Sequence, residues 1–105
     1  MRIEFEAKPK ARAALVALLE ARADYATDAL LQAQIFIEDV REELLRTGEP
    51  PDDAHVVRFG ENGYWWLYID GVWLGFRRVD TWSGWFRIRT RTVTLLSAVG
   101  VPPHV

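Results

Sequence analysis

The residues that could do acid–base or nucleophilic chemistry are few and scattered. His55 and His104 are the two histidines, and neither has a partner at the spacing of a metal-binding or acid–base pair. Ser83 and Ser97 lie outside any nucleophile-elbow pattern, and the absence of cysteine excludes thiolate metal sites and cysteine nucleophiles. The sequence predicts no metal site, no cofactor and no nameable catalytic residue.

Charge is distributed unevenly along the chain. Residues 1–54 carry 7 Arg and Lys against 12 Asp and Glu, whereas residues 55–105 carry 6 Arg against 3 Asp and Glu. The acidic residues of the first part include a patch that is typical of a solvated helix face: Glu38, Asp39, Glu42 and Glu43. The basic second part favours a polyanionic partner, unless the acidic helices only compensate the charge of the sheet.

Size and composition indicate a single globular domain. The chain has 105 residues, of which 50% are hydrophobic, which is enough for a core. No stretch approaches the ~20 apolar residues of a membrane span, and the first residues alternate charged with apolar side chains, unlike a signal peptide. Together with the lack of cysteine, this composition favours a cytoplasmic protein with no membrane partner.

The first half of the chain predicts a strand followed by helix. Residues 2–6 alternate apolar with charged side chains, as a half-buried strand does. Pro9 suits the first turn of a helix, and no Gly or Pro follows it before Gly48. Apolar residues then step by threes and fours, the spacing of an amphipathic helix: Leu15, Leu19, Ala23, Ala26, Leu30, Ala33, Ile37, Val40 and Leu44.

A single helix over this segment would be about 55 Å long, which exceeds what a domain of this size can cover. Compactness therefore requires a break, although the apolar spacing alone does not. We predict two helices, at about residues 9–24 and 28–47, with Thr27 or Asp28 as the N-cap of the second.

The second half predicts an antiparallel meander over residues 55–99, followed by a tail at 100–105. Its strands are expected at residues 55–59, 64–69, 72–79 and about 85–99. Asp70-Gly71 is a strong hairpin signal, because a type I′ turn needs positive φ at both positions. The expected fold is therefore α+β, with an N-terminal strand and a two-helix hairpin packed on one face of a C-terminal antiparallel β-meander.

The Asp70-Gly71 turn fixes which side chains share a face of this sheet. One face is apolar and is expected to lie under the helices: Trp65 pairs with Phe76, Leu67 with Leu74, and Ile69 with Val72. The opposite face carries the remaining pairs: Tyr64 beside Arg77, Trp66 beside Gly75, and Tyr68 beside Trp73.

The next turn decides where three arginines point. A two-residue loop at 83–84 would place Arg87 and Arg89 on the apolar face, where burial of charge is costly. We therefore predict a three-residue loop at 82–84, with Gly84 in the left-handed conformation. The side chains that follow then divide between the two faces: Phe86 and Ile88 point to the core, and Arg87, Arg89 and Arg91 to the opposite face.

This register gives a face of interleaved aromatic and arginine side chains, which we predict to be the binding site: Tyr64, Trp66, Tyr68, Trp73, Arg77, Arg87, Arg89 and Arg91. Arginine binds phosphate and stacks on rings, and aromatic side chains stack on unpaired bases. The same composition also marks protein–protein hot spots. A nucleic acid, a protein partner or homodimer, and cation–π packing without any ligand are therefore the three interpretations.

The order of strand, two helices and antiparallel meander resembles the RelE/ParE superfamily of bacterial toxins. The most similar part is the opening, Ile-Glu-Phe at residues 3–5 followed by Ala-Lys-Pro-Lys-Ala at 7–11 and an Ala/Leu-rich helix. The resemblance implies helices on one sheet face and a functional, often basic, opposite face. It also implies a toxin-like role in a bacterium or phage and an antitoxin-like protein partner.

The sequence departs from that family in ways that bear on catalysis. The chain is acidic overall, and residues 63–68 lack the arginines of the family's Arg-Gly-Tyr-Arg pattern. The ribonuclease branch of that family generally relies on basic residues and a C-terminal tyrosine or histidine. Because no tyrosine follows Tyr68, His104 is the one acid/base group that remains there. We therefore expect a toxin-like macromolecule-binding module that acts by occlusion. The alternative is a non-toxic, homodimeric or host-factor-binding interaction protein. If the chain is an enzyme, the resemblance implies an RNA-cleaving ribonuclease of the toxin type.

Overall fold

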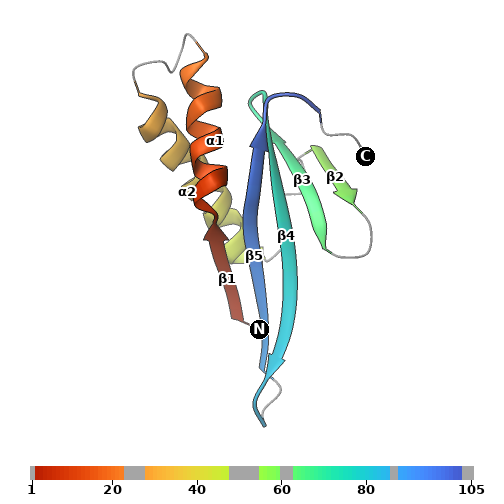
Figure 1. The fold of residues 1–105 in the computed structure, drawn as a ribbon. Helices are drawn as coiled ribbons and strands as arrows, with labels where there is room; N and C mark the ends of the chain where they lie inside the picture. Colours follow the sequence, from red (N-terminus) through yellow and green to blue (C-terminus); the bar gives the residue numbers. More distant parts are fainter. Residues whose placement is uncertain (1, 23–27, 48–54, 60–62, 86–87, 103–105) are drawn as a thin grey trace.

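The computed structural model describes residues 2–22, 28–47, 55–59, 63–85 and 88–102, and it has the expected α+β fold. Its elements are β1 (Arg2–Ala7), α1 (Pro9–Glu20), α2 (Ala29–Thr47), β2 (His55–Phe59), β3 (Tyr64–Ile69), β4 (Val72–Ser83) and β5 (Ile88–Val99). The strands form one sheet in the order β1-β5-β4-β3-β2 (Figure 1). Strands β2 to β5 pair antiparallel, as predicted, and β1 joins the edge of the meander parallel to β5.

The predicted break between the two helices is confirmed. Helix α1 begins at Pro9, whose missing N–H costs nothing in the first turn, and it ends at Glu20. The carbonyl of Asp28 accepts a hydrogen bond of 2.9 Å from the N–H of Gln32, which places Asp28 at the N-cap position of α2. Thr27, the other predicted cap, lies outside the described residues.

The helices bury the predicted stripe with one exception. The buried helical residues are Ala11, Leu15 and Leu19 of α1 and Ala29, Ala33, Ile37, Val40 and Leu44 of α2. Leu30 was expected on this stripe but is 65% exposed, because it lies in the first turn of α2 at the margin of the helix's buried side. Ala23 and Ala26 lie outside the described residues.

The β3–β4 hairpin has the predicted register. Asp70 and Gly71 both have positive φ, 47° and 83°, as a type I′ turn requires. One face of the sheet, here called the inner face, carries the core residues of β3, β4 and β5: Trp65, Leu67, Val72, Leu74, Phe76, Val93, Leu95 and Ala98. The other face is called the outer face. On the inner face Trp65 stacks on Phe76 with ring centroids 4.3 Å apart. A buried side chain of this size contributes roughly 2–3 kcal/mol.

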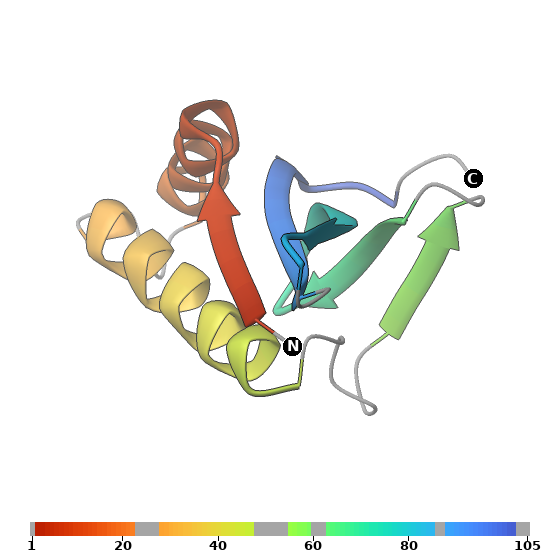
Figure 2. The same ribbon diagram turned by 90° about the horizontal axis from the view of Figure 1, so that it is seen from below.

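Both helices lie on the inner side of the sheet, beside β1 and β5, with β2 at the far edge (Figure 2). The β4–β5 hairpin continues past both helices and forms one end of the molecule (Figure 1), whose extents are 52 × 28 × 25 Å. Among the described residues, no helix has the length and apolarity needed to cross a bilayer. The two described helices therefore leave the outer face and the end of the hairpin uncovered.

Candidate functional site

The outer face of β3 and β4 brings together five of the eight predicted site residues: Tyr64, Trp66, Tyr68, Trp73 and Arg77. Strand alternation directs these side chains away from the core. Tyr64 and Tyr68 are each 38% exposed, Arg77 is exposed, and the two tryptophans are half-buried. We call these five residues the aromatic face.

Contacts between the strands hold the aromatic face in place. The rings of Tyr68 and Trp73 lie 5.0 Å apart between centroids and are tilted by 51°. The guanidinium carbon of Arg77 lies 5.3 Å from the centre of the Tyr64 ring, within the range of a cation–π contact. Both pairs are directly opposite in the hairpin register, so they also stabilise the sheet.

Gly75 makes room for the ring of Trp66. A Cβ atom at Gly75 would lie 2.8 Å from Cζ3 of Trp66 and 2.5 Å from Oγ of Ser97. Such distances are too short for a carbon side chain, so the Trp66 ring packs directly over the β4 backbone. The β4–β5 ladder has a bulge at this point, because Gly75 stands opposite Ser97 but Phe76 stands opposite Leu95.

The surroundings of the aromatic face are polar but only weakly basic. Thr94 of β5 stands opposite Arg77, and Glu6 of β1 stands opposite Thr94. Two residues earlier in both strands, Glu4 stands opposite Thr92. Arg77 is the one arginine that the described parts of β3, β4 and β5 contribute to the outer face. On β1 that face carries Arg2, Glu4 and Glu6, and the two carboxylates form ion pairs with Arg2 at 3.1 Å and with Lys8 at 3.3 Å.

Arg89 and Arg91 lie on the inner face, so their predicted place on the aromatic face is wrong. Strand β4 continues to Ser83, which pairs with Ile88, so four residues connect β4 to β5 instead of the predicted three. Because the loop is one residue longer than predicted, each following side chain of β5 points to the face of the sheet opposite the predicted one. Ile88, predicted to enter the core, is exposed for the same reason.

From the sequence, we rejected the register that directs Arg89 to the inner face, because it would bury an arginine. The carboxylate of Asp80 was not considered as the compensating charge. Asp80 stands directly opposite Arg91. The predicted left-handed conformation of Gly84 is confirmed by its φ of 77°. Phe86 and Arg87, whose directions were also predicted, lie outside the described residues.

Asp80 accepts hydrogen bonds from Arg89 and Arg91, the two arginines that lie on the inner face. Arg91 binds it through two nitrogens, Nε at 2.9 Å from Oδ1 and Nη2 at 3.1 Å from Oδ2, and Nη2 of Arg89 also bonds to Oδ2. The hydrogen bond from Arg91 is the main cause that lowers the pKa of Asp80 to about 2, against the opposing effect of burial. Arg91 is only 6% exposed, so its charge is compensated inside the hairpin.

Two features of the hairpin were missed in the sequence. Asp80 is the one acidic residue after Asp70, and three arginines follow it within eleven positions, which is a detectable signal for pairing. Trp82 and Trp85 are 66% and 99% exposed at the projecting end of the hairpin. No local pattern distinguishes these tryptophans from core residues, because their exposure depends on where the helices end.

The other groups considered for chemistry do not come together. Glu38 and Glu43 of α2 form ion pairs with Arg41 and Arg46 at 3.6 and 2.5 Å, as on a solvated helix face. Within the described ranges, no cluster of His, Cys, Asp and Glu could hold a metal ion. His55 begins β2, three strands from Ser97 on β5.

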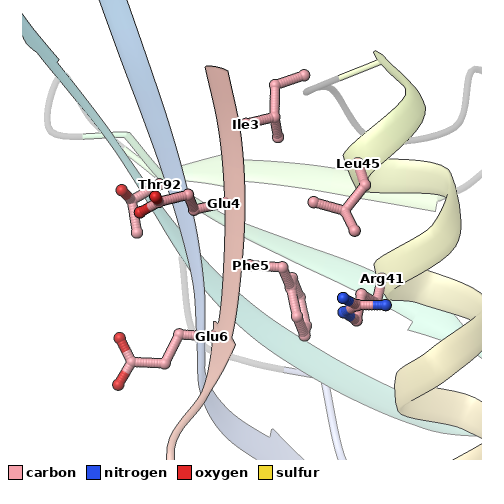
Figure 3. A pocket seen from close by; sticks show the side chains of 7 residues that line it. All are labelled: Ile3, Glu4, Phe5, Glu6, Arg41, Leu45 and Thr92. Atoms are coloured by element: carbon pink, nitrogen blue, oxygen red, sulfur yellow. The ribbon is translucent and has the colours of Figure 1, made fainter.

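A hollow lies around the edge strand β1. Its lining residues are Ile3, Glu4, Phe5, Glu6, Arg41, Leu45 and Thr92. Figure 3 shows Ile3 and Phe5 on the side of β1 that faces α2, and Glu4 and Glu6 on the other side. The hollow therefore follows an edge strand and does not gather its carboxylates around one point.

Comparison with known proteins adds no further assignment. No protein-family model, no curated protein and no solved structure gives a significant match to this chain. The resemblance to RelE/ParE toxins stays a prediction from the sequence, and the aromatic face is the candidate site on the strength of its own geometry.

Proposed function

We propose that this chain is a toxin-like protein-binding module that acts through the aromatic face and occludes a surface of its partner. One observation carries this proposal: two tyrosines, two tryptophans and an arginine share a sheet face that no described helix covers. Aromatic and arginine side chains supply most of the binding energy in protein interfaces. The core of the molecule lies on the opposite face, so these side chains have room to meet a partner.

The distribution of charge favours a protein over a nucleic acid. With Arg89 and Arg91 engaged by Asp80 on the inner face, Arg77 is the remaining described arginine beside the aromatic rings. Affinity for nucleic acid depends on several phosphate contacts from basic side chains. On β1, Glu4 and Glu6 share the outer face with Arg2 and form ion pairs with Arg2 and Lys8, so this strand adds no excess positive charge for such contacts.

The packing of the aromatic face also supports binding. Trp66 is fixed over Gly75, and Tyr68 is fixed against Trp73. A side chain that is already ordered loses little conformational entropy when a partner covers it, so more of the contact energy appears as affinity. The half-buried tryptophans would form a rigid floor, and the exposed tyrosines would make the first contact.

The resemblance to RelE/ParE toxins suggests the biological setting of this binding. An antitoxin-like protein would cover the same face as the target and would thereby control it. The alternative is a non-toxic interaction protein that uses the same face for a host factor. Growth of a bacterial host that expresses the chain separates the two, because only the toxin-like role predicts arrest.

The decisive variant is Tyr64→Thr/Tyr68→Thr, because threonine keeps strand propensity and both tyrosines are exposed. We expect growth arrest to be lost. We also expect the Kd for the product of an adjacent reading frame, measured by calorimetry, to rise about tenfold or more. The matched control is Val79→Thr, which changes an outer-face residue with the same 38% exposure beyond Arg77.

Unchanged arrest and unchanged affinity in the double tyrosine variant would contradict the proposal, as would equal losses in the Val79 control. RNA binding that weakens steeply with salt, and that Arg77→Gln abolishes, would instead identify a nucleic-acid partner. Circular dichroism of all variants checks that the sheet is retained.

A further inference from the structure

A second surface, separate from the aromatic face, lies at the projecting end of the β4–β5 hairpin. Trp82 and Trp85 are 66% and 99% exposed. Ile88 is exposed too, but it stands opposite Ser83 and therefore lies on the other side of the hairpin from Trp82. We call the two tryptophans the hairpin end. Large apolar side chains gathered at one exposed place are unusual on a monomer and mark interaction surfaces.

A complementary surface lies on the outward side of α2. Leu31 and Ile35 lie one turn apart and are both exposed near the start of this helix, and we call them the α2 patch. Acidic residues flank the patch, since Asp28 precedes Leu31 by three positions and Asp39 follows Ile35 by four, which places them on the same side of the helix. Neither of these two carboxylates forms an ion pair within the described part of the chain.

The two surfaces have opposite charge. Residues 28–47 contain five acidic and two basic side chains, whereas residues 80–91 contain three arginines and one aspartate. Asp80 is shared by Arg89 and Arg91, so this cluster keeps one positive charge in excess. Complementary charge around two apolar surfaces both steers association and selects the partner.

The positions of the two surfaces on the molecule also allow them to meet when two copies pack together. The hairpin forms one end of the 52 Å long axis, and α2 begins toward the other end (Figure 1). Trp82 belongs to the same strand face as Phe76 and Asp80, so it projects on the side of the sheet that bears the helices, beyond their reach. Two antiparallel copies with their helix sides together would therefore bring each hairpin end over the α2 patch of the other.

We propose that a second copy of this chain docks in this way, as a two-fold dimer that pairs the hairpin end of each copy with the α2 patch of its partner. The two-fold arrangement forms this contact twice and so doubles the buried area. Each contact surface is small, and a stable interface buries about 800 Å² of each partner. The aromatic faces point outward in such a dimer and remain free. The proposal thus goes beyond the proposed function and uses different residues.

The first test measures the oligomeric state by sedimentation velocity over a range of protein and salt concentrations. We expect a dimer that Trp85→Ser weakens by about tenfold or more in Kd, and that high salt also weakens. Trp85 is almost fully exposed, so this change should leave the fold intact. The matched control is Val101→Ser, an apolar residue that is 69% exposed outside both surfaces and should leave the Kd unchanged.

The second test uses the absence of natural cysteine. A mixture of Trp85→Cys and Leu31→Cys chains should form a disulfide-linked heterodimer under mild oxidation faster than a mixture of Val101→Cys and Leu31→Cys chains. A chain that carries both Trp85→Cys and Leu31→Cys should give a covalent dimer and not a ladder of larger species, because the two-fold arrangement is closed.

The proposal is overturned by a chain that stays monomeric at all concentrations, by equal effects of Trp85→Ser and Val101→Ser, or by a ladder from the doubly substituted chain. None of these outcomes bears on the aromatic face. If the dimer is absent while the Tyr64→Thr/Tyr68→Thr variant loses its partner, only the dimer is wrong. If the dimer is present while the Tyr64→Thr/Tyr68→Thr variant keeps its partner, the dimer stands and only the proposed function is wrong.

Discussion

At the scale of single residues, Asp80 decides the chemistry of the second half of the chain. It fixes two arginines that the sequence interpretation had assigned to the binding site. That interpretation treated a buried arginine as costly, which is correct for an unpaired charge but not for one bound through two nitrogens. A change of one position in register was sufficient to move Arg89 and Arg91 to the other face.

The Asp80 cluster makes stability depend on acid pH. The pKa of Asp80 lies at about 2, against an ordinary value of 3.8, so its contribution is complete above about pH 4 and is lost as the pH falls through 2. We expect this carboxylate to account for about 2 kcal/mol of the fall in unfolding free energy over that interval. Urea denaturation at a series of pH values measures it.

The variant Asp80→Asn should lack this part of the pH dependence. It should also lose about 3 kcal/mol at pH 7, because Arg91 would stay buried without its carboxylate. Asp39→Asn, which changes an exposed aspartate on α2, should keep the pH profile of the original chain. Parallel profiles for Asp80→Asn and the unchanged chain would show that the cluster does not stabilise the hairpin.

At the scale of elements, features specified locally were predictable. The start of α1 follows from Pro9, and the β3–β4 register follows from the Asp70-Gly71 turn, because each depends on the backbone preferences of one or two residues. The β4–β5 connection was not predictable in the same way. Its length depends on how far β4 extends past the helices, which is a tertiary property.

The bulge between β4 and β5 supports a prediction at this scale. Gly75→Ala would place a Cβ atom against both Trp66 and Ser97, and we expect it to cost about 1–3 kcal/mol in unfolding free energy. In a Ser97→Ala background the contact with Oγ disappears, so part of this loss should be recovered. If Gly75→Ala is neutral by urea denaturation, Trp66 is not held over the strand as described.

At the scale of the whole molecule, the sheet has three surfaces with different roles. Its inner face holds the core, its outer face carries the aromatic side chains, and the end of the β4–β5 hairpin extends beyond the helices. Part of the uneven charge seen in the sequence follows this division, since residues 28–47 carry five acidic and two basic side chains and residues 80–91 carry three arginines and one aspartate. The sequence predicted the first two surfaces, but the third depends on the length by which the hairpin outreaches the helices.

This division predicts how stability varies along the hairpin. The first half of β4, Val72 to Arg77, lies between β3 and β5, whereas Thr81 to Ser83 pair only with β5. Backbone hydrogen bonds in a two-stranded end open more readily than those inside a sheet. In dilute protein we therefore expect amide hydrogen exchange to be at least about tenfold faster at Thr81 to Ser83 than at Val72 to Arg77.

In concentrated protein, a second copy bound at the hairpin end should slow exchange there and leave the first half of β4 unchanged. The Trp85→Ser chain serves as the control, because its hairpin end should exchange rapidly at both concentrations. Equal protection along β4 in dilute protein would contradict the two-stranded end, and exchange independent of concentration would contradict the docking of a second copy.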